Sequence, residues 1–251
     1  MVMSRRRFYA EPRMISGSTV DLSPEETHHL VRVLRMKAGD EAFIFDGCGF
    51  EYRCRLASLS GDNARLEIIE TLGGEVESPV RITLAQALAK GEKFDFIVQK
   101  ATELGVSAIL PLVTDRADVK LDEGGARKRI ERWRRVSLEA VKQSGRRRLV
   151  EISAPLTLEE FFDAFGADPG PKLVFSERGG GPLAGALGGA GRMASVAAVI
   201  GPEGGWSDGE LELLGARAAS IITLGPRVLR TETAAIAAIT LLQHALGDLS
   251  N

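Results

Sequence analysis

Charged residues surround two Gly-Pro corners near the C-terminal end of the chain. The stretch "VAAVIGPEGGW" covers residues 196–206, and "SIITLGPRVLRTET" covers residues 220–233. A glycine at each corner leaves backbone N–H and C=O groups uncovered, and the proline after it stiffens the turn. Uncovered main-chain groups can hydrogen-bond a flat heterocycle. The two corners therefore predict a site for an adenine-containing ligand, and the alternative is a pair of sharp loops without a ligand.

Three charged side chains, Glu203, Arg230 and Glu232, lie on or beside these corners. A carboxylate can take a proton from a substrate, and a guanidinium can stabilise an anion. For Glu232 the alternative is a helix-dipole partner in the first turn of a helix. Two common nucleotide-binding motifs are excluded. The sequence contains no GxxxxGK[ST] phosphate loop. The stretch "GAGRMA" (189–194) has the spacing of a dinucleotide fingerprint, but it precedes a predicted strand, whereas the fingerprint opens a helix.

The elements that position the corners alternate between strand and helix from Pro79 onward. Strands are predicted at residues 81–88, 106–114, 172–177, 195–200 and 220–225, with helices at 92–105, at 126–144, after Ser207 and at 233–246. This alternation predicts an α/β domain with a mostly parallel sheet covered on both faces. Ligands of such sheets bind at the carboxyl ends of the strands, where both corners and a third loop, "FSERGGG", are found.

The N-terminal part of the chain has a different pattern. A helix is predicted to begin at Ser23, with Pro24 in the first position and Glu26 completing a capping box. Three β-rich runs follow, "EAFIFDG", "FEYRCRLASL" and "NARLEIIETL", with turn signals between them. We therefore predict a small β-barrel-like domain at residues 1–73 and the α/β domain at residues 79–251.

Basic residues are concentrated in one segment, although the net charge of the chain is only -2. Residues 120–148 hold eleven Lys or Arg against four Asp or Glu, a surplus of seven, whereas residues 149–251 hold six against twelve. Such a segment predicts contact with a polyanion such as nucleic acid, and a solvated helix face is the alternative. The two cysteines and three histidines lack metal-ligand spacing, so no metal site is predicted. Without a signal peptide or an apolar membrane span, the protein is expected to be cytoplasmic.

Four stretches carry a resemblance to a known family. "IGPEGGW", "LGPRVLRTETAAIAA", "KGEKFDFIVQKATELGVSAILPLVTDR" and "HHLVRVLRMKAGDEAFIFDG" together resemble the RsmE-type small-subunit ribosomal RNA uridine N3-methyltransferases of the SPOUT superfamily. The similarity extends from residue 6 to the last helix. It implies a PUA-like RNA-binding domain, a SPOUT methyltransferase domain with a trefoil knot, S-adenosylmethionine as methyl donor, and a homodimer. One departure is Lys142 in "AVKQSGR", where the family usually has an acidic residue.

The resemblance also implies roles for the residues of both corners. Arg230, Thr231 and Glu232 would lie where the methyl group meets the base. The implied cofactor-binding residues are Gly201, Pro202, Glu203, Gly204, Leu224, Gly225, Leu229, Arg230, Thr231 and Thr233. Because uracil N3 carries a proton, methylation requires that this proton be removed or the anion be stabilised. We expect Arg230 to stabilise the uridine anion, and Glu232 or Glu203 to act as base or to orient a water.

The implied substrate is small-subunit ribosomal RNA or the assembled small ribosomal subunit, with the target base single-stranded or flipped out of its stack. Expected RNA-binding residues are Arg5, Arg6, Arg7, Arg127, Arg132, Arg135, Arg146, Arg147 and Arg148. Trp133 and Trp206 are expected in the core or a dimer contact.

Two other functions remain open. One is a non-catalytic RNA-binding or ribosome-assembly protein that retains the fold, which the intact corners disfavour. The other is an enzyme that binds another adenine nucleotide, which the missing phosphate loop disfavours.

Overall fold

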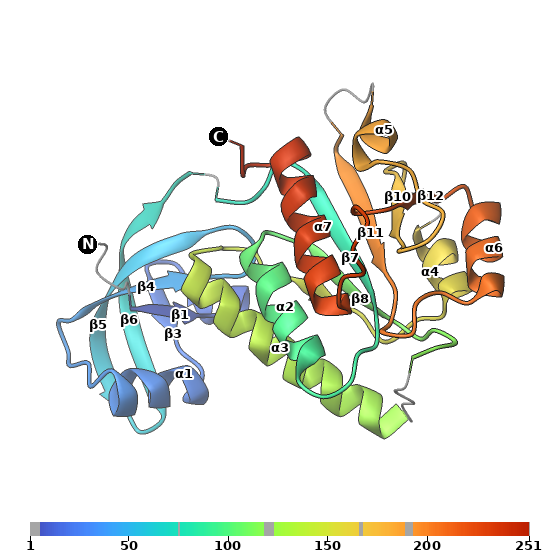
Figure 1. Ribbon diagram of the computed structural model, residues 1–251. Helices are drawn as coiled ribbons and strands as arrows, with labels where there is room; N and C mark the ends of the chain where they lie inside the picture. The colour runs from blue at the N-terminus through green and yellow to red at the C-terminus, as the bar shows by residue number, and fades with distance from the viewer. Residues whose placement is uncertain (1–5, 75, 118–122, 166–167, 189–192, 251) are drawn as a thin grey trace. The chain divides into compact units, whose positions relative to one another are not determined.

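The computed structural model describes residues 6–74, 76–117, 123–165, 168–188 and 193–250 (Figure 1). The chain divides into two compact units. Unit 1 comprises Met1–Glu77 and Val141–Leu149, and unit 2 comprises Ser78–Ala140 and Val150–Asn251. The expected domains were 1–73 and 79–251, and the segment 141–149, inside the second of these, clusters with unit 1. Among the described residues, no helix is both long and apolar enough to cross a membrane.

Unit 1 is built on a six-stranded mixed sheet with the order β1-β4-β5-β6-β3-β2. The strands are β1 (Arg7–Tyr9), β2 (Ile15–Ser16), β3 (Thr19–Asp21), β4 (Glu41–Phe45), β5 (Glu51–Ser60) and β6 (Asn63–Leu72). The three predicted strands correspond to β4, β5 and β6. The three strands not predicted contain two or three residues each, too few for an alternating pattern to be visible in the sequence.

One helical segment covers the core of unit 1. It consists of α1 (Pro24–His28) and a π-helical turn at His29–Val33, after a short 3-10 turn at Pro12–Met14. Ser23 caps α1 as predicted, because its hydroxyl accepts a hydrogen bond from the Glu26 N–H. The Glu26 carboxylate receives the Lys142 ammonium, so the unusual lysine forms an ion pair within unit 1.

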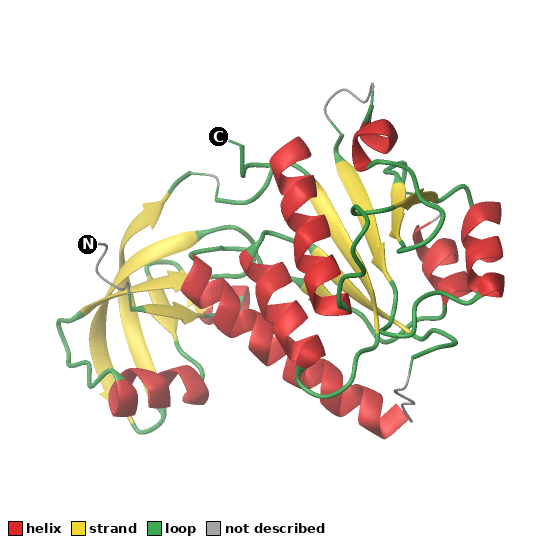
Figure 2. Ribbon diagram, viewed as in Figure 1, coloured by secondary structure: helices red, strands yellow, loops and turns green. Residues whose placement is uncertain are grey.

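Unit 2 is built on a six-stranded sheet with the order β12-β10-β11-β7-β8-β9, in which every neighbouring pair runs parallel. The strands are β7 (Arg81–Ala87), β8 (Ala108–Leu112), β9 (Glu151–Ile152), β10 (Lys172–Phe175), β11 (Ser195–Ile200) and β12 (Ser220–Ile222). The helices are α2 (Lys93–Glu103), α3 (Glu123–Ser144), α4 (Leu158–Phe165), α5 (Leu183–Leu187), α6 (Asp208–Ala216) and α7 (Thr231–Leu246). The last residues of α3, from Val141 onward, belong to unit 1. Figure 2 shows the helices on both sides of the sheet.

Alternate residues of the central strands enter two separate cores, one on each face of the sheet. On β11, Ala198 and Ile200 belong to one core, whereas Ala197 and Val199 belong to the other. Trp133 of α3 is buried in the first core, and Trp206 is buried in the second. The predicted parallel sheet with two covered faces is therefore confirmed, as is the core position of both tryptophans. The implied trefoil knot stays a prediction, because strand order does not define how the chain threads.

Candidate active site

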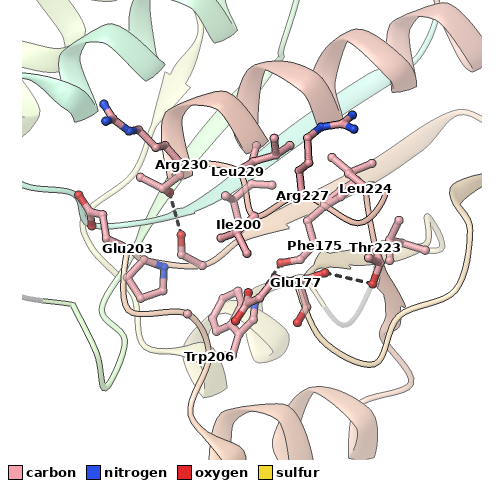
Figure 3. A pocket seen from close by; sticks show the side chains of 18 of the residues that line it. Phe175, Glu177, Ile200, Glu203, Trp206, Thr223, Leu224, Arg227, Leu229 and Arg230 are labelled. Carbon is pink, nitrogen blue, oxygen red and sulfur yellow. Dashed lines mark hydrogen bonds between the residues drawn. The ribbon is translucent and has the colours of Figure 1, made fainter.

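A pocket of about 320 Å³ lies where β10, β11 and β12 end. Parallel strands present their carboxyl ends at one edge of the sheet, so the loops that follow them converge there. Three loops line the pocket: residues 175–177 after β10, 200–206 after β11 and 222–231 after β12 (Figure 3). The two Gly-Pro corners predicted to form one site therefore do so. In the sequence, the loop after β10 stands out only as a glycine-rich strand end.

Local geometry favours glycine at both corners. A Cβ atom on Gly201 would lie 3.0 Å from the ring of Trp206, which is tighter than most carbon contacts in proteins. The tryptophan is fixed in turn, because its indole N–H donates to the Phe175 carbonyl at 3.1 Å. Gly225 has φ of +77°, a conformation that side-chain-bearing residues rarely adopt. The pocket wall is therefore formed by backbone at these two positions.

The pocket combines apolar walls with a carboxylate and with backbone N–H groups that can bind a ligand. Ile200, Leu224 and Leu229 line it beside the carboxylate of Glu177. Within the described part of the chain, the N–H groups of Leu224 and Leu229 donate no hydrogen bond. An adenosyl ligand has a flat apolar face, ring nitrogens that accept hydrogen bonds and ribose hydroxyls that can donate to a carboxylate. The residues present therefore fit a group of this kind.

Four charged side chains gather at one side of the pocket. Figure 3 shows Glu203 and Arg230 on the same side, with Arg227 on the opposite side. The Lys93 ammonium at the start of α2 donates to Glu203 Oε1 at 2.9 Å, and Glu232 acts electrostatically on the same lysine. Oε2 of Glu232 is buried and lacks a hydrogen-bond partner among the described residues. The cluster contains two cations and two carboxylates, which suits a reaction that moves a proton and creates an anion.

The pKa of Glu203 reflects two opposing influences. Partial burial raises this pKa, but the hydrogen bond from Lys93 and smaller contributions lower it, and the net shift is downward. The same hydrogen bond to Glu203 raises the pKa of Lys93. Glu203 is therefore ionised at neutral pH, and a carboxylate with a lowered pKa is a weaker base.

We expect Lys93→Met to raise the pKa of Glu203, because the hydrogen bond and positive charge that favour its ionised form are removed. Carbon-13 NMR of the glutamate carboxyl groups across an acid titration measures this shift. The matched control is Lys100→Met on the same helix, since Lys100 pairs with Glu103 at 2.8 Å and is similarly exposed. An unchanged Glu203 titration in Lys93→Met would contradict the assignment.

Most of the residues implied for the cofactor surround this pocket. Gly201, Pro202, Glu203, Gly204, Leu224, Gly225, Leu229, Arg230 and Thr231 all line it. Thr233 does not line the pocket, and its side chain is exposed on α7. Sequence reasoning missed Glu177 and Arg227 in the lining, and Lys93 beside it. The lysine occurs in the quoted stretch "KGEKFDFIVQKATELG", but its contact with Glu203 joins residues 110 positions apart.

The structure corrects the expected RNA-binding role of three arginines. Arg7, Arg146 and Arg147 are directed into unit 1, with side chains only 6–8% exposed. Arg7 and Arg147 both pair with the Glu51 carboxylate, at 2.7 and 3.3 Å, and Arg146 pairs with Glu77 at 2.7 Å. Because buried guanidinium groups with carboxylate partners do not face solvent, these three are not available as phosphate contacts.

The other candidate RNA contacts are exposed or lie outside the described residues. Arg127, Arg132 and Arg135 are exposed on α3, and Arg132 also contacts Asp95. Arg6 and Arg148 are exposed in unit 1, and Arg5 lies outside the described residues. Five arginines of the expected set are therefore open to solvent.

Comparisons with known proteins agree with this fold. Residues 22–69 match the family described as the RNA methyltransferase PUA domain, and residues 76–243 match the RNA methyltransferase domain. The two matches define a PUA-containing RNA methyltransferase. Ribosomal RNA small subunit methyltransferase E of Synechocystis is 36% identical over 96% of this chain and 78% of its own length. The Bacillus subtilis protein of the same name is 32% identical over 90% of each chain. This chain belongs to the ribosomal RNA small subunit methyltransferase E family.

Solved structures of relatives extend the agreement to the whole fold. Ribosomal RNA small subunit methyltransferase E of Neisseria gonorrhoeae, bound to S-adenosyl methionine, has a TM-score of 0.85 and 33% identity, over 98% of this chain and 99% of that one. A Legionella pneumophila structure in complex with bound SAM has a TM-score of 0.89 and 36% identity, over 98% and 99%. The resemblance inferred from the four sequence stretches is thereby confirmed.

Proposed function

We propose that the protein transfers the methyl group of S-adenosylmethionine to N3 of a specific uridine in small-subunit ribosomal RNA. The observation that carries the proposal is the pocket between two backbone corners, with the cluster of Lys93, Glu203, Arg230 and Glu232 at one side. The family and the cofactor-bound Neisseria relative support the same reaction class. The N3 position and the identity of the uridine come from the resemblance.

The residues of the pocket would hold the cofactor through both corners. Leu224 and Leu229 offer N–H groups that donate to no other described residue, and the Glu177 carboxylate can accept from hydroxyl or ammonium groups. S-adenosylmethionine supplies an electrophilic methyl group on a sulfonium. Arg230 stabilises the negative charge that the uracil ring carries when N3 loses its proton. Glu232 or Glu203 takes that proton or orients the water that does.

Methyl transfer from labelled S-adenosylmethionine to small ribosomal subunits that lack the modification tests the proposal. Mass mapping should find the label on one uridine N3. Label at another atom or on another RNA would overturn the N3 assignment. A thermal-shift screen separates the alternatives, because S-adenosylhomocysteine should stabilise the protein and ATP or NAD should not. Absence of stabilisation by S-adenosylhomocysteine would favour a non-catalytic RNA-binding or ribosome-assembly protein.

The exposed arginines of α3 provide a surface for the RNA backbone in this proposal. We expect the triple variant Arg127→Ala, Arg132→Ala, Arg135→Ala to weaken RNA binding. The slope of the logarithm of the binding constant against the logarithm of the salt concentration should become shallower by about one unit for each phosphate that is no longer bound. Filter binding at several salt concentrations measures both quantities. The matched control is Arg217→Ala, at an exposed arginine just after α6 that pairs with Asp163, and it should change neither quantity.

Arg147→Met distinguishes a structural from an RNA-binding role for the buried arginines. Because it leaves the Glu51 carboxylate short of a buried partner, we expect it to lower the free energy of unfolding by about 3 kcal/mol. The salt slope of RNA binding should stay unchanged for the folded variant. A shallower salt dependence of RNA binding, with an unchanged free energy of unfolding, would show that Arg147 contacts RNA.

The proposal includes a homodimer in the cytoplasm, with the assembled small subunit or its RNA as partner. Exposed apolar side chains on two helices of unit 2 support self-association, namely Phe96 on α2 and Leu241 on α7. Light scattering after size-exclusion chromatography measures the mass in solution. A monomer at micromolar concentration would overturn the dimer.

A further inference from the structure

A buried glutamine connects the two corners of the pocket. Gln86, near the end of β7, has no solvent exposure and does not line the pocket. Its side-chain Nε2 donates to the Thr231 hydroxyl at 3.0 Å and to the Ala87 carbonyl at 3.1 Å. The Thr231 hydroxyl donates in turn to the Gly201 carbonyl at 2.8 Å. This chain of hydrogen bonds joins the end of β7, the corner after β11 and the first residue of α7.

The direction of each bond follows from the groups involved. A threonine hydroxyl has one proton, and the Gly201 carbonyl can only accept it. The Thr231 oxygen must therefore accept from Gln86, and the Ala87 carbonyl must accept as well. Both contacts of Gln86 require an N–H donor, which places Nε2 toward them and Oε1 away.

Gln86 carries an energetic penalty that its contacts do not remove. Oε1 of Gln86 is buried and has no partner among the residues that the structure describes. A buried carbonyl oxygen left without a donor costs about 1–3 kcal/mol. In the parallel ladders Gln86 lies between Ile200 of β11 and Pro111 of β8. An apolar side chain of similar length suits this position at least as well for stability alone.

The separation of the corners matters because one ligand must contact both. The N–H groups of Leu224 and Leu229 are on the loop that leads to Thr231, and Gly201 is on the facing corner. Free loops lose entropy when a ligand orders them, and a tether that holds them in advance removes part of that loss. The Gln86–Thr231–Gly201 chain is such a tether, anchored on a central strand of the sheet.

We propose that Gln86 is a positioning residue that acts through Thr231 to fix the separation of the two corners, and thereby sets affinity for the adenosyl cofactor. The cofactor part of this inference rests on the proposed function. Gln86 itself contacts neither cofactor nor RNA in this account.

Gln86→Met tests the inference, because methionine keeps the length of the side chain and removes the N–H donors. Calorimetric titration should show S-adenosylhomocysteine binding weakened about tenfold or more, with the Tm of the ligand-free protein within about 3 °C of wild type. The matched control is Gln243→Met on α7. Gln243 is also fully buried, donating to the Leu104 carbonyl and accepting from Ser78 at 2.7 Å each. We expect this control to lower the Tm and to leave the affinity for S-adenosylhomocysteine unchanged.

A double-variant cycle tests whether Gln86 acts through Thr231. If it does, Gln86→Met with Thr231→Val should weaken binding no further than Thr231→Val alone. Thr231→Ser, which keeps the hydroxyl, should bind more tightly than Thr231→Val. Fully additive losses in the double variant would overturn the relay. If Gln86→Met does not fold, Gln86→Leu, which also removes the N–H donors, takes its place in the cycle.

Amide hydrogen exchange of the ligand-free protein separates this inference from the proposed function. In Gln86→Met, exchange should accelerate in residues 201–206 and 223–230 and stay unchanged at the Gln243 end of α7. Unchanged exchange at the corners, together with unchanged affinity, would overturn the positioning role. Wild-type protein that fails to bind S-adenosylhomocysteine would overturn the proposed cofactor instead, and the exchange result alone would then decide the role of Gln86.

Discussion

Replacing Arg230 with alanine should lower kcat by about 10²–10³-fold while S-adenosylhomocysteine affinity stays within about threefold of wild type. Arg230 borders the pocket at the side where Glu203 also lies, and its side chain is exposed there. In the proposed function, the guanidinium at that position stabilises the substrate base and contributes little to binding of the adenosyl group. Its contribution therefore falls on the transition state, where the uracil ring carries negative charge. Single-turnover methyl transfer and calorimetry measure the two quantities separately.

Arg230→Lys sharpens the same test. Lysine keeps the positive charge but presents a single ammonium in place of a planar fork of donors. Partial recovery of kcat relative to Arg230→Ala would indicate that charge near the ring oxygens is the main contribution. Arg217→Ala, at an exposed arginine outside the pocket lining, controls for loss of surface charge. Arg230→Ala with intact cofactor binding and unchanged turnover would contradict the catalytic role.

The fold and the convergence of the two corners on one pocket could be predicted because their signals are local. A Gly-Pro corner after an apolar strand can be recognised within about ten residues of sequence. Parallel strands place such corners at one edge of the sheet regardless of the length or structure of the segments between them. The capping box of α6, with Ser207 and Glu210, is equally local and is present in the structure. These features depend on backbone conformation close to the residues that show them.

Two arginines of the basic segment were misassigned because a count of charges does not identify their partners. Arg146 and Arg147 are in the densest basic run, but their carboxylates, Glu77 and Glu51, precede them by 69 and 96 residues. Only the folded chain brings them together. For the same reason the sequence did not indicate that residues 141–149 belong to unit 1, since the predicted helix continues through that point without a break.

The polar groups beside the pocket were missed for a related reason. Gln86 is in an apolar strand, where a single polar residue has no periodic signature, and its partner Thr231 is 145 residues away. Lys93 is at the start of a predicted helix, where a lysine gives no signal beyond that of a solvated residue. Contacts of this range are set by strand order in the sheet, which periodicity does not define.

Glu232→Gln should reduce the methyl-transfer rate more than Glu203→Gln does, by about 10²–10⁴-fold against about tenfold or less. The sequence left both carboxylates open as the base. In the structure Lys93 binds Glu203 and lowers its pKa, which weakens it as a proton acceptor. Glu232 Oε2 is buried without a hydrogen-bond partner in the described part of the chain, and in the proposed function it accepts the N3 proton.

The pH dependence of the single-turnover rate decides between the two carboxylates. If Glu232 takes the proton, Glu232→Gln should recover toward the wild-type rate at high pH, because uridine N3 then loses its proton to solvent without help. Glu203→Gln should keep the pH profile of the wild type, since the residue that accepts the proton is still present. A larger loss in Glu203→Gln, or no recovery of Glu232→Gln at high pH, would transfer the role of base away from Glu232. In that event the buried carboxylate would act as the helix-dipole partner at the start of α7, and it would stabilise the cations of the cluster without exchanging a proton.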